Sequence, residues 1–268
     1  MRKNADILII DDEPVVVDSV KKILSAENFT VDTARDSNDG LKKIETRHYQ
    51  LIICDIMMPE IDGFQFLEIL KEKNINTPVI MVTGYATAGN AVKSLYAGAI
   101  DFLPKPFTAD EILSTVRRGI RYNAIQNKIM NRSSNSDKDS LLYVPCPATY
   151  YRFGYCCWAK TEQDGTIRTG LFDLFLQTIE SIEQIIPAKT DETIIQGHSC
   201  LQIKTKDQLV HNVLAPVSGR IVKRNNSILE NIDIIQKDPY FKGWIYLIIP
   251  SNREFDMKNL IPCSSDRI

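Results

Sequence analysis

Acidic residues, a threonine and a lysine follow four apolar runs of the sequence, at the points where each run ends. Asp11 and Asp12 follow residues 6–10, Asp55 follows residues 51–54, Thr83 follows residues 78–82, and Lys105 follows residues 99–103. Apolar runs without polar alternation are typical of strands buried on both faces, as in a parallel sheet covered by helices. Because such a sheet brings the carboxyl ends of its strands to one edge, we expect these side chains to lie together.

This assortment of side chains suggests a chemistry. Three carboxylates packed together repel one another, so the group calls for a divalent cation with hard oxygen ligands, and Mg²⁺ fits best. A neighbouring carboxylate can then attack phosphorus, while the metal and the lysine neutralise the charge that develops. The alternative is a structural cluster of acids, because Asp is common in loops after strands. Four strands ending in this ordered way favour the phosphoryl chemistry.

The motifs around these residues resemble a known family. They are Asp11-Asp12, Asp55 with Met57-Met58-Pro59 and Asp62-Gly63, Thr83-Gly84, and Lys105-Pro106-Phe107. Over residues 4–122 this set is similar to the receiver domain of bacterial two-component response regulators. The resemblance implies a flavodoxin-like, doubly wound parallel sheet of five strands, and the regular alternation of strand and helix patterns agrees with it.

The resemblance also implies a role for each site residue. Asp55 is the expected phosphoacceptor for a sensor histidine kinase. Asp12 and Asp55 are the expected Mg²⁺ ligands, with Asp11 acting through water and the Met57 carbonyl oxygen completing the set. Lys105 and the Thr83 hydroxyl are expected to contact the phosphoryl group, and Phe102 matches the switch aromatic of the family. We expect a signalling protein rather than a conventional enzyme, although the receiver is expected to catalyse its own phosphorylation and dephosphorylation.

Composition and charge are those of an ordinary globular protein of 268 residues. The net charge is −3 over residues 1–122 and +1 beyond them, so neither half has the basic excess typical of nucleic-acid binding. The sequence opens without a signal peptide pattern, and no apolar run approaches the ~20 residues that span a bilayer. We therefore expect a cytoplasmic protein that binds neither membrane nor nucleic acid.

The chain is expected to contain two domains. The fifth helix of the first domain is predicted to continue to Met130, and residues 131–140 are polar and small, as in a flexible linker. The predicted boundaries are 1–122 for the receiver, 123–144 for the helix extension and linker, and 145–268 for the second domain.

Beyond the linker the pattern changes to short strand-like runs separated by turn residues. These runs cover residues 155–161, 166–171, 193–196, 200–204, 213–223, 232–236 and 244–249, with one helix expected between 172 and 182. Many short strands indicate a β-sandwich or barrel. The two or three helices of a DNA-binding output domain are missing from this pattern.

Residues 158–170, 214–222 and 238–245 resemble the glycine cleavage H-protein, a lipoyl carrier, over residues 145–258. The implied fold is a barrel-sandwich hybrid, so the whole chain is α/β plus all-β. In that family the lipoylated lysine lies eight positions before the proline of the Pro-Val-Ser-Gly turn, which here is Gln208. Lys206 and Lys204 are close by, and a slip of two residues in a hairpin would keep Lys206 on the same side. We favour a protein-binding output module over a lipoyl carrier.

The six cysteines leave a third alternative, a thiol or metal redox module. A reducing cytosol disfavours a disulfide framework, and no CxxC pair indicates zinc. His198 and Cys200 could join Cys146 or Cys156 as metal ligands, but small buried thiols are more common. If Cys156 and Cys157 lie on one strand, at most one is buried.

We also expect His48 and His211 at the surface, and Cys54, Trp158 and Trp244 in the core.

Together these inferences give one hypothesis. Phosphorylation of Asp55 alters the surface formed by residues 91–102 and changes how it meets a partner protein or a second copy, as in a phosphorylation-dependent homodimer. The second domain would then act by contact with an unidentified protein partner.

Overall fold

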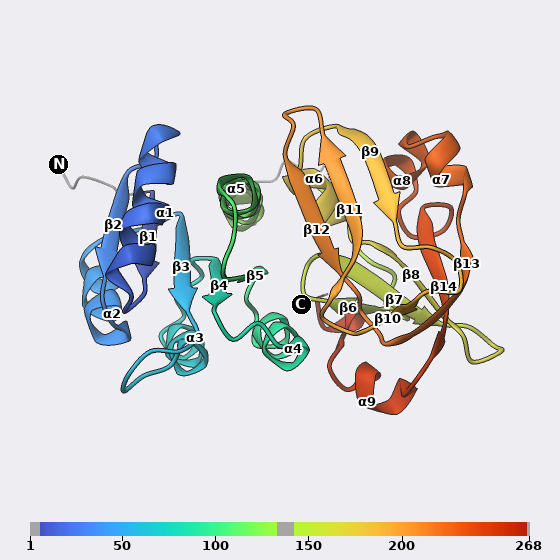
Figure 1. Cartoon of the computed structure of the whole chain (residues 1–268), viewed down its shortest axis with the longest axis horizontal. Coiled ribbons are helices and arrows are strands. Elements are labelled where there is room, and N and C mark those ends of the chain that lie inside the picture. Colours follow the sequence, from blue (N-terminus) through green and yellow to red (C-terminus); the bar gives the residue numbers. More distant parts are fainter. Residues whose placement is uncertain (1–5, 133–141, 267–268) are drawn as a thin grey trace. The chain divides into compact units, whose positions relative to one another are not determined.

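The structure, a computed structural model, describes residues 6–132 and 142–266, and the described chain forms two compact units (Figure 1). The first unit contains a parallel sheet with the strand order β2-β1-β3-β4-β5. Its strands are β1 (Ile7–Ile10), β2 (Val31–Ala34), β3 (Leu51–Asp55), β4 (Val79–Thr83) and β5 (Asp101–Pro104). The helices that follow these strands in the sequence are α1 (Pro14–Ala26), α2 (Ser37–Thr46), α3 (Gly63–Glu72), α4 (Ala88–Tyr96) and α5 (Ala109–Arg132). This strand order is that of the flavodoxin-like fold, so the predicted α/β fold is confirmed.

Local sequence explains how these elements form. Every residue of β1, β3 and β4 is buried, in agreement with their unbroken apolar runs. Helix α1 starts with Pro14 in its first turn, where the missing N–H costs nothing, and it buries Val17, Val20 and Leu24 on one face. Helix α5 has 24 residues and ends at Arg132, so its predicted extension past the sheet is confirmed. Most of the predicted linker lies outside the described residues.

A capping box fixes the chain immediately after the third strand. The Gln65 amide donates to Asp62 Oδ1 at 2.8 Å, and the Asp62 amide donates to Gln65 Oε1 at 2.9 Å. The next residue, Gly63, packs so tightly that a Cβ there would lie 2.4 Å from the carbonyl oxygen of Asp55 and 2.7 Å from Met81 Cε. The start of α3 therefore rests directly on the end of β3.

Replacing Gly63 by alanine is expected to destabilise the first unit by about 1–3 kcal/mol, because the backbone of Asp55 cannot move aside for the new methyl group. Gly84→Ala is the matched control, since a Cβ at Gly84 meets no atom within 4 Å. Urea denaturation followed by far-UV circular dichroism measures both variants. Equal stability of the two variants would contradict the close contact at Gly63.

The second unit is built from two antiparallel sheets. The larger has the order β10-β13-β14-β8-β7-β6-β15 and the smaller has the order β12-β11-β9. Their strands are β6 (Tyr151–Phe153), β7 (Cys157–Thr161), β8 (Ile167–Leu171), β9 (Ile182–Pro187), β10 (Thr193–Ile194), β11 (Ser199–Thr205), β12 (Val210–Leu214), β13 (Gly219–Arg224), β14 (Trp244–Pro250) and β15 (Ile261–Pro262). The short helices are α6 (Asp173–Thr178), α7 (Ser227–Glu230), α8 (Asp233–Lys237), α9 (Arg253–Met257) and the 3₁₀ helix η1 (Cys263–Asp266). The predicted strand-rich second domain is confirmed.

Trp158 anchors the core of this unit. Its side chain is fully buried, and its indole N–H donates to the carbonyl oxygen of Pro239 at 3.1 Å. The ring packs against Tyr150 and Tyr240, with centroids 5.0 Å and 6.4 Å away. Gly170 on the neighbouring strand makes room for the indole, because a Cβ there would lie 2.5 Å from Trp158 Cζ2. The second tryptophan, Trp244, is only half-buried, so the prediction that it lies in the core is wrong.

Two strand predictions in this unit are wrong. Residues 232–236 were expected to form a strand, but they fall largely in helix α8, where the Asn231 side chain accepts a hydrogen bond from the Asp233 amide at 3.1 Å and only Ile235 is buried. The predicted strand over residues 213–223 is two strands, β12 and β13. Pro216 lies between them and cannot donate to a ladder of strand hydrogen bonds.

Two further burial predictions are wrong. Cys156 and Cys157 are both buried, because Cys156 lies in a turn before β7 and does not follow the alternation of the strand. His211 is buried rather than at the surface, with its ring edge against Phe175 and a ring nitrogen 3.3 Å from Thr205 Oγ1. His48 is exposed, and Cys54 is buried in β3, as expected.

Asp173 is a buried carboxylate at the start of α6. Its Oδ2 accepts a hydrogen bond from the Val144 amide at 2.5 Å, and its Oδ1 accepts one from Gln177 Nε2 at 3.3 Å. Burial raises the pKa of Asp173, and these hydrogen bonds only partly oppose that effect. The ionised form therefore weakens the fold at neutral pH.

As the pH falls through the raised pKa of Asp173, the unfolding free energy of the second unit is expected to rise in the wild type relative to the Asp173→Asn variant. The folded state then binds a proton that the unfolded state still lacks, whereas asparagine has none to bind. Both tryptophans lie in the second unit, so urea titrations followed by tryptophan fluorescence at several pH values measure the difference. A stability difference independent of pH would contradict the raised pKa.

Candidate functional site

The sheet register brings the predicted site residues of the first unit to one edge. Strand β1 pairs with β3, β3 with β4, and β4 with β5, all in parallel. Asp55 therefore pairs with Val82, the residue before Thr83. Thr83 in turn pairs with Pro104, the residue before Lys105. Asp11 follows the last residue of β1.

Lys105 links the acidic residues of this edge. Its Nζ lies 2.7 Å from Asp11 Oδ2, 2.8 Å from Asp55 Oδ1 and 2.9 Å from Glu13 Oε1. Asp11 and Asp55 are each only 3% exposed, whereas the Glu13 side chain is mostly exposed. The sequence analysis missed Glu13, although its position directly after the Asp11-Asp12 pair is a signal that could have found it.

The second oxygen of each buried carboxylate accepts a backbone hydrogen bond. The Met57 amide donates to Asp55 Oδ2 at 2.6 Å, and the Glu13 amide donates to Asp11 Oδ1 at 2.9 Å. The Met57 side chain is exposed, and the predicted metal-binding role of its carbonyl oxygen stays a prediction. These bonds hold the two carboxylates with one oxygen each turned toward Lys105.

Charge in this group is not balanced by the lysine alone. Burial raises the pKa of Asp55 and of Asp11, although the close Lys105 ammonium opposes this effect. Burial tends to lower the pKa of Lys105, but its contacts with Asp11, Asp55 and Glu13 outweigh burial and raise it, so the ammonium stays charged. One cation thus faces three carboxylates, and a second cation at this edge would relieve their repulsion.

The donor set fits Mg²⁺. Asp55 Oδ1 is a buried oxygen without a hydrogen-bond donor among the described residues, since its contact with Lys105 is an ion pair that lacks hydrogen-bond geometry. Asp12, next in sequence to Asp11, is exposed to solvent. Among residues 6–132 and 142–266, no three His, Cys, Asp or Glu side chains form a ready-made metal site. Mg²⁺ typically takes one or two carboxylates and keeps several waters, so it does not need such a cage.

Thr83 and Phe102 lie on the adjoining strands β4 and β5. Thr83 is fully buried, and its Oγ1 accepts a hydrogen bond from the Tyr85 amide at 3.1 Å. The Lys105 amide donates to the carbonyl oxygen of Thr83 at 2.7 Å, which ties the two site residues together through the backbone. Phe102 is buried, directly opposite Met81 of β4. The switch roles of Thr83 and Phe102 stay predictions.

In the second unit the position of the carrier lysine lies on the turn between β11 and β12. Gln208 occupies this turn in the left-handed region, with φ 65°, and its Nε2 donates to Glu183 Oε2 at 3.2 Å. Lys206, two residues earlier, is exposed, and Lys204 is half-buried. The tip of the hairpin thus presents a glutamine at the position for which the resemblance predicts a lipoylated lysine.

The six cysteines are all buried free thiols. Burial raises the pKa of Cys200 to about 12 and raises that of Cys157, so both thiols stay protonated at neutral pH. In the part of the chain that the structure describes, His198, Cys200, Cys146 and Cys156 do not form a metal-binding group. Thiolate chemistry is therefore disfavoured at Cys157 and Cys200.

Comparison with protein families agrees with this division of the chain. Residues 7–117 match the family model of the response regulator receiver domain, and residues 149–264 match that of the glycine cleavage H-protein. The chain thus contains one region that matches the receiver domain of response regulators and a second region that matches the glycine cleavage H-protein.

Curated relatives include regulators of gene expression. The transcriptional regulatory protein DltR of Streptococcus agalactiae is 32% identical over 139 residues, which are 50% of this chain and 62% of DltR. The nitrogen assimilation regulatory protein NtrX of Azorhizobium caulinodans is 35% identical over 126 residues, which are 46% of this chain and 28% of NtrX. This chain thus spans less than two thirds of either relative.

A solved glycine cleavage system H protein from Mycobacterium marinum is 24% identical to this chain. The match covers 42% of this chain and 98% of that one, with a TM-score of 0.37.

No helix in the described ranges is long and apolar enough to cross a membrane.

Proposed function

We propose that this chain is a phosphorelay response regulator in which Asp55 accepts a phosphoryl group from a sensor histidine kinase. The observation that supports this best is the position of Lys105, with its Nζ 2.7 Å from Asp11 and 2.8 Å from Asp55 at the carboxyl edge of the sheet. A buried ammonium held beside a buried carboxylate is suited to a reaction in which negative charge arrives next to that carboxylate.

In the proposed transfer, a carboxylate oxygen of Asp55 forms a bond to phosphorus while the bond from phosphorus to the kinase histidine nitrogen breaks. The electron pair of the broken bond stays on that nitrogen. Lys105 would exchange its contact with Asp55 for one with a phosphoryl oxygen, and the Thr83 hydroxyl would donate to another. Mg²⁺, with Asp12 and Asp55 as ligands and Asp11 acting through water, would supply further positive charge beside the phosphoryl oxygens.

The consequence of phosphorylation is proposed to appear on the surface of residues 91–102. Thr83 would leave the Tyr85 amide, to which it is bonded at 3.1 Å, and Phe102 would change its packing. Because β4 and β5 are neighbours, with Thr83 opposite Pro104 and Met81 opposite Phe102, a change at Thr83 would reach Phe102 through these adjoining residues. This surface would then meet a partner protein or a second copy of the chain.

The test is the uptake of a phosphoryl group from acetyl phosphate or phosphoramidate. We expect the intact mass of the full chain to rise by one phosphoryl group in the presence of Mg²⁺ and not to rise in excess EDTA, because charge neutralisation at the edge of the sheet is then lost. Light scattering of both samples shows whether size or shape changes. Absence of any mass gain with Mg²⁺ present would refute the proposed phosphoacceptor.

We further propose that the second unit acts by binding a protein rather than by carrying lipoate or binding DNA. Support comes from Gln208, which has no amine to acylate at the hairpin tip. Intact mass after co-expression with a lipoate ligase tests this proposal. An unmodified chain is expected, whereas an adduct mapped to Lys206 or Lys204 would make the unit a phosphorylation-controlled carrier.

A further inference from the structure

The larger sheet of the second unit carries a row of cations on one face. Residues that pair directly across neighbouring antiparallel strands point to the same face of a sheet. The row crosses β13, β14, β8 and β7, which are neighbours in this sheet (Figure 1). Its members, called the cationic row below, pair in the order Lys223, Leu247, Arg168 and Lys160.

The cationic row faces solvent. The adjoining row across the same strands consists of Ile221, Ile248 and Ile167, which are all fully buried and belong to the opposite face. Lys223, in contrast, is exposed, and the side chains of Arg168 and Lys160 are 35% and 34% exposed. A ligand that approaches this face of the sheet can therefore reach all three cations.

The positive charge of the cationic row is only partly compensated. Glu162 Oε1 lies 2.9 Å from Arg168 Nε, and its Oε2 lies 3.4 Å from Lys160 Nζ, so one carboxylate faces two cations. Within residues 6–132 and 142–266, Lys223 takes part in no ion pair. Three cations and one acid leave two positive charges in excess, which favours an anionic ligand.

Apolar surface adjoins these cations. Trp244 is half-buried, and the Arg168 guanidinium and the Lys223 ammonium lie 5.6 Å and 6.0 Å from its ring centre. Leu247 separates Lys223 from Arg168 in the row. Ile249, two positions further along β14, pairs with Arg220 and is 45% exposed. The face thus offers contacts to carboxylates and to apolar side chains together.

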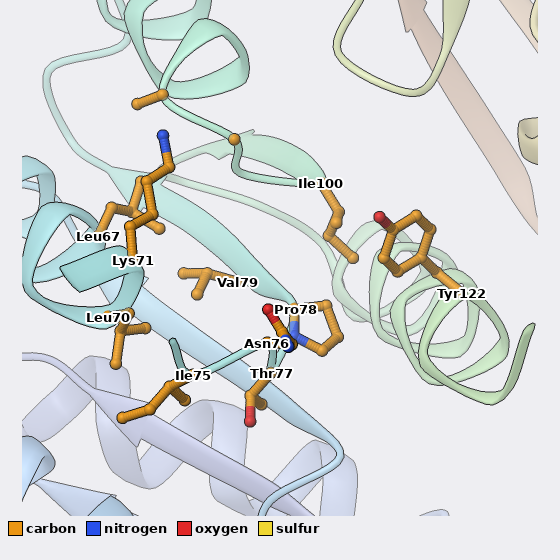
Figure 2. A pocket seen from close by; sticks show the side chains of 12 residues that line it. Leu67, Leu70, Lys71, Ile75, Asn76, Thr77, Pro78, Val79, Ile100 and Tyr122 are labelled. Carbon is orange, nitrogen blue, oxygen red and sulfur yellow. The ribbon is translucent and has the colours of Figure 1, made fainter. Parts of the chain in front are cut away.

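The first unit has a pocket where β4 and β5 begin, but its polar groups do not converge (Figure 2). Lys71 lies beside the Gly98 turn, where a Cβ of residue 98 would be 3.6 Å from Lys71 Nζ. Asn76 and Thr77 lie on the far side of this open pocket (Figure 2). The pocket therefore does not define one ligand, whereas the cationic row selects for charge.

We propose that the face around the cationic row binds an acidic segment of a partner protein, with apolar residues among its carboxylates. Its carboxylates pair with Lys223 and Arg168, and its apolar side chains cover Leu247 and Ile249. Nucleic acid is disfavoured, because Glu162 repels phosphates along the row and the residues beyond 122 carry a net charge of only +1. This inference rests on the proposed protein-binding role of the second unit and names the chemistry of its partner.

NMR titration of the ¹⁵N-labelled full chain is the test. The chain has two tryptophans, of which Trp158 is fully buried and donates its indole N–H to Pro239, while Trp244 lies on the proposed face. The probe is the peptide acetyl-Glu-Leu-Glu-Glu-Leu-Glu-amide. We expect a saturable shift of the Trp244 indole N–H signal and none of the Trp158 signal. Binding is expected to weaken several-fold between about 0.05 M and about 0.5 M salt, because salt screens exposed charges.

Two variants and a second peptide make the test specific. Lys223→Glu replaces an attraction by a repulsion and is expected to weaken binding about tenfold. Lys258→Glu, at an exposed lysine that ends α9, is the matched control and is expected to bind as the wild type does. The peptide acetyl-Gln-Leu-Gln-Gln-Leu-Gln-amide, which lacks the charges, is expected to give no saturable shift.

Four results would overturn the proposal. They are no saturable shift of the Trp244 signal, equal binding of the glutamine peptide, unchanged binding by Lys223→Glu, and tighter binding of an oligothymidylate than of the glutamate peptide. The lipoylation experiment is read from the mass of the chain and this one from the Trp244 signal. Failure of this inference and failure of the protein-binding role are therefore distinguishable.

Discussion

Replacing Asp55 by asparagine is expected to reduce phosphoryl uptake from acetyl phosphate to below detection. The carboxamide has the shape of the carboxylate and keeps an oxygen for the Met57 amide, which bonds Asp55 at 2.6 Å, but it has no nucleophilic oxygen. Intact-mass spectrometry of both proteins, incubated with Mg²⁺ and the phosphodonor, measures the loss. Asp18→Asn on the exposed face of α1 is the matched control and is expected to gain mass as the wild type does.

The loss is not expected to come from unfolding. Burial raises the pKa of Asp55, which means that the folded state disfavours its charged form, so a neutral side chain fits at least as well. Lys105 retains Asp11 and Glu13 as partners at 2.7 Å and 2.9 Å. We therefore expect the melting temperature of Asp55→Asn to equal or exceed that of the wild type. A mass gain in this variant would show that another residue is the phosphoacceptor.

Truncation of Trp158 to alanine is expected to destabilise the second unit by about 3–5 kcal/mol. The fully buried indole fills the space over Gly170 and is surrounded by Tyr150 and Tyr240, so its removal leaves a cavity that these rigid rings cannot close. It also leaves the carbonyl oxygen of Pro239 without its donor. A loss of this size is comparable to the whole stability of many domains.

Trp244→Ala provides the comparison. Trp244 is half-buried, and the charged groups of Arg168 and Lys223 lie 5.6 Å and 6.0 Å from its ring centre, so its loss is expected to cost about 1 kcal/mol. In each variant the remaining tryptophan reports urea unfolding of the same unit by its fluorescence. Equal costs for the two substitutions would contradict the anchoring role of Trp158.

The first unit was largely predictable because its strands are short, apolar and buried on both faces. Once residues at the ends of β1, β3, β4 and β5 are recognised, a parallel sheet must bring them to one edge. The contact of Lys105 with Glu13 was not predicted, since 92 positions separate them and Glu13 is an exposed residue at a helix start; its place directly after the Asp11-Asp12 pair was the one signal for it. Among the five strands of the first unit, β2, four residues with mixed polarity, is the one that was given no range from the sequence.

The second unit was less predictable because both sheets have irregular burial. In β9 the buried residues are Ile182 and Ile185, which do not alternate as a half-buried strand should, and this strand was missed. The run at 232–236 is rich in isoleucine and predicted a strand, but it forms a short helix with one buried residue. In such short segments, contacts with the rest of the folded chain outweigh the secondary-structure preference of the local sequence.

Helix α5 has a mechanical consequence. At about 1.5 Å per residue its 24 residues form a rod of ~36 Å, of which the portion beyond residue 117 continues past the receiver match. Its first residue, Ala109, follows Lys105 by only four positions. A small tilt of the first turn, if a change at Lys105 produced one, would become a larger displacement at Arg132. The helix can serve as a lever arm that turns chemistry at one end into movement at the other.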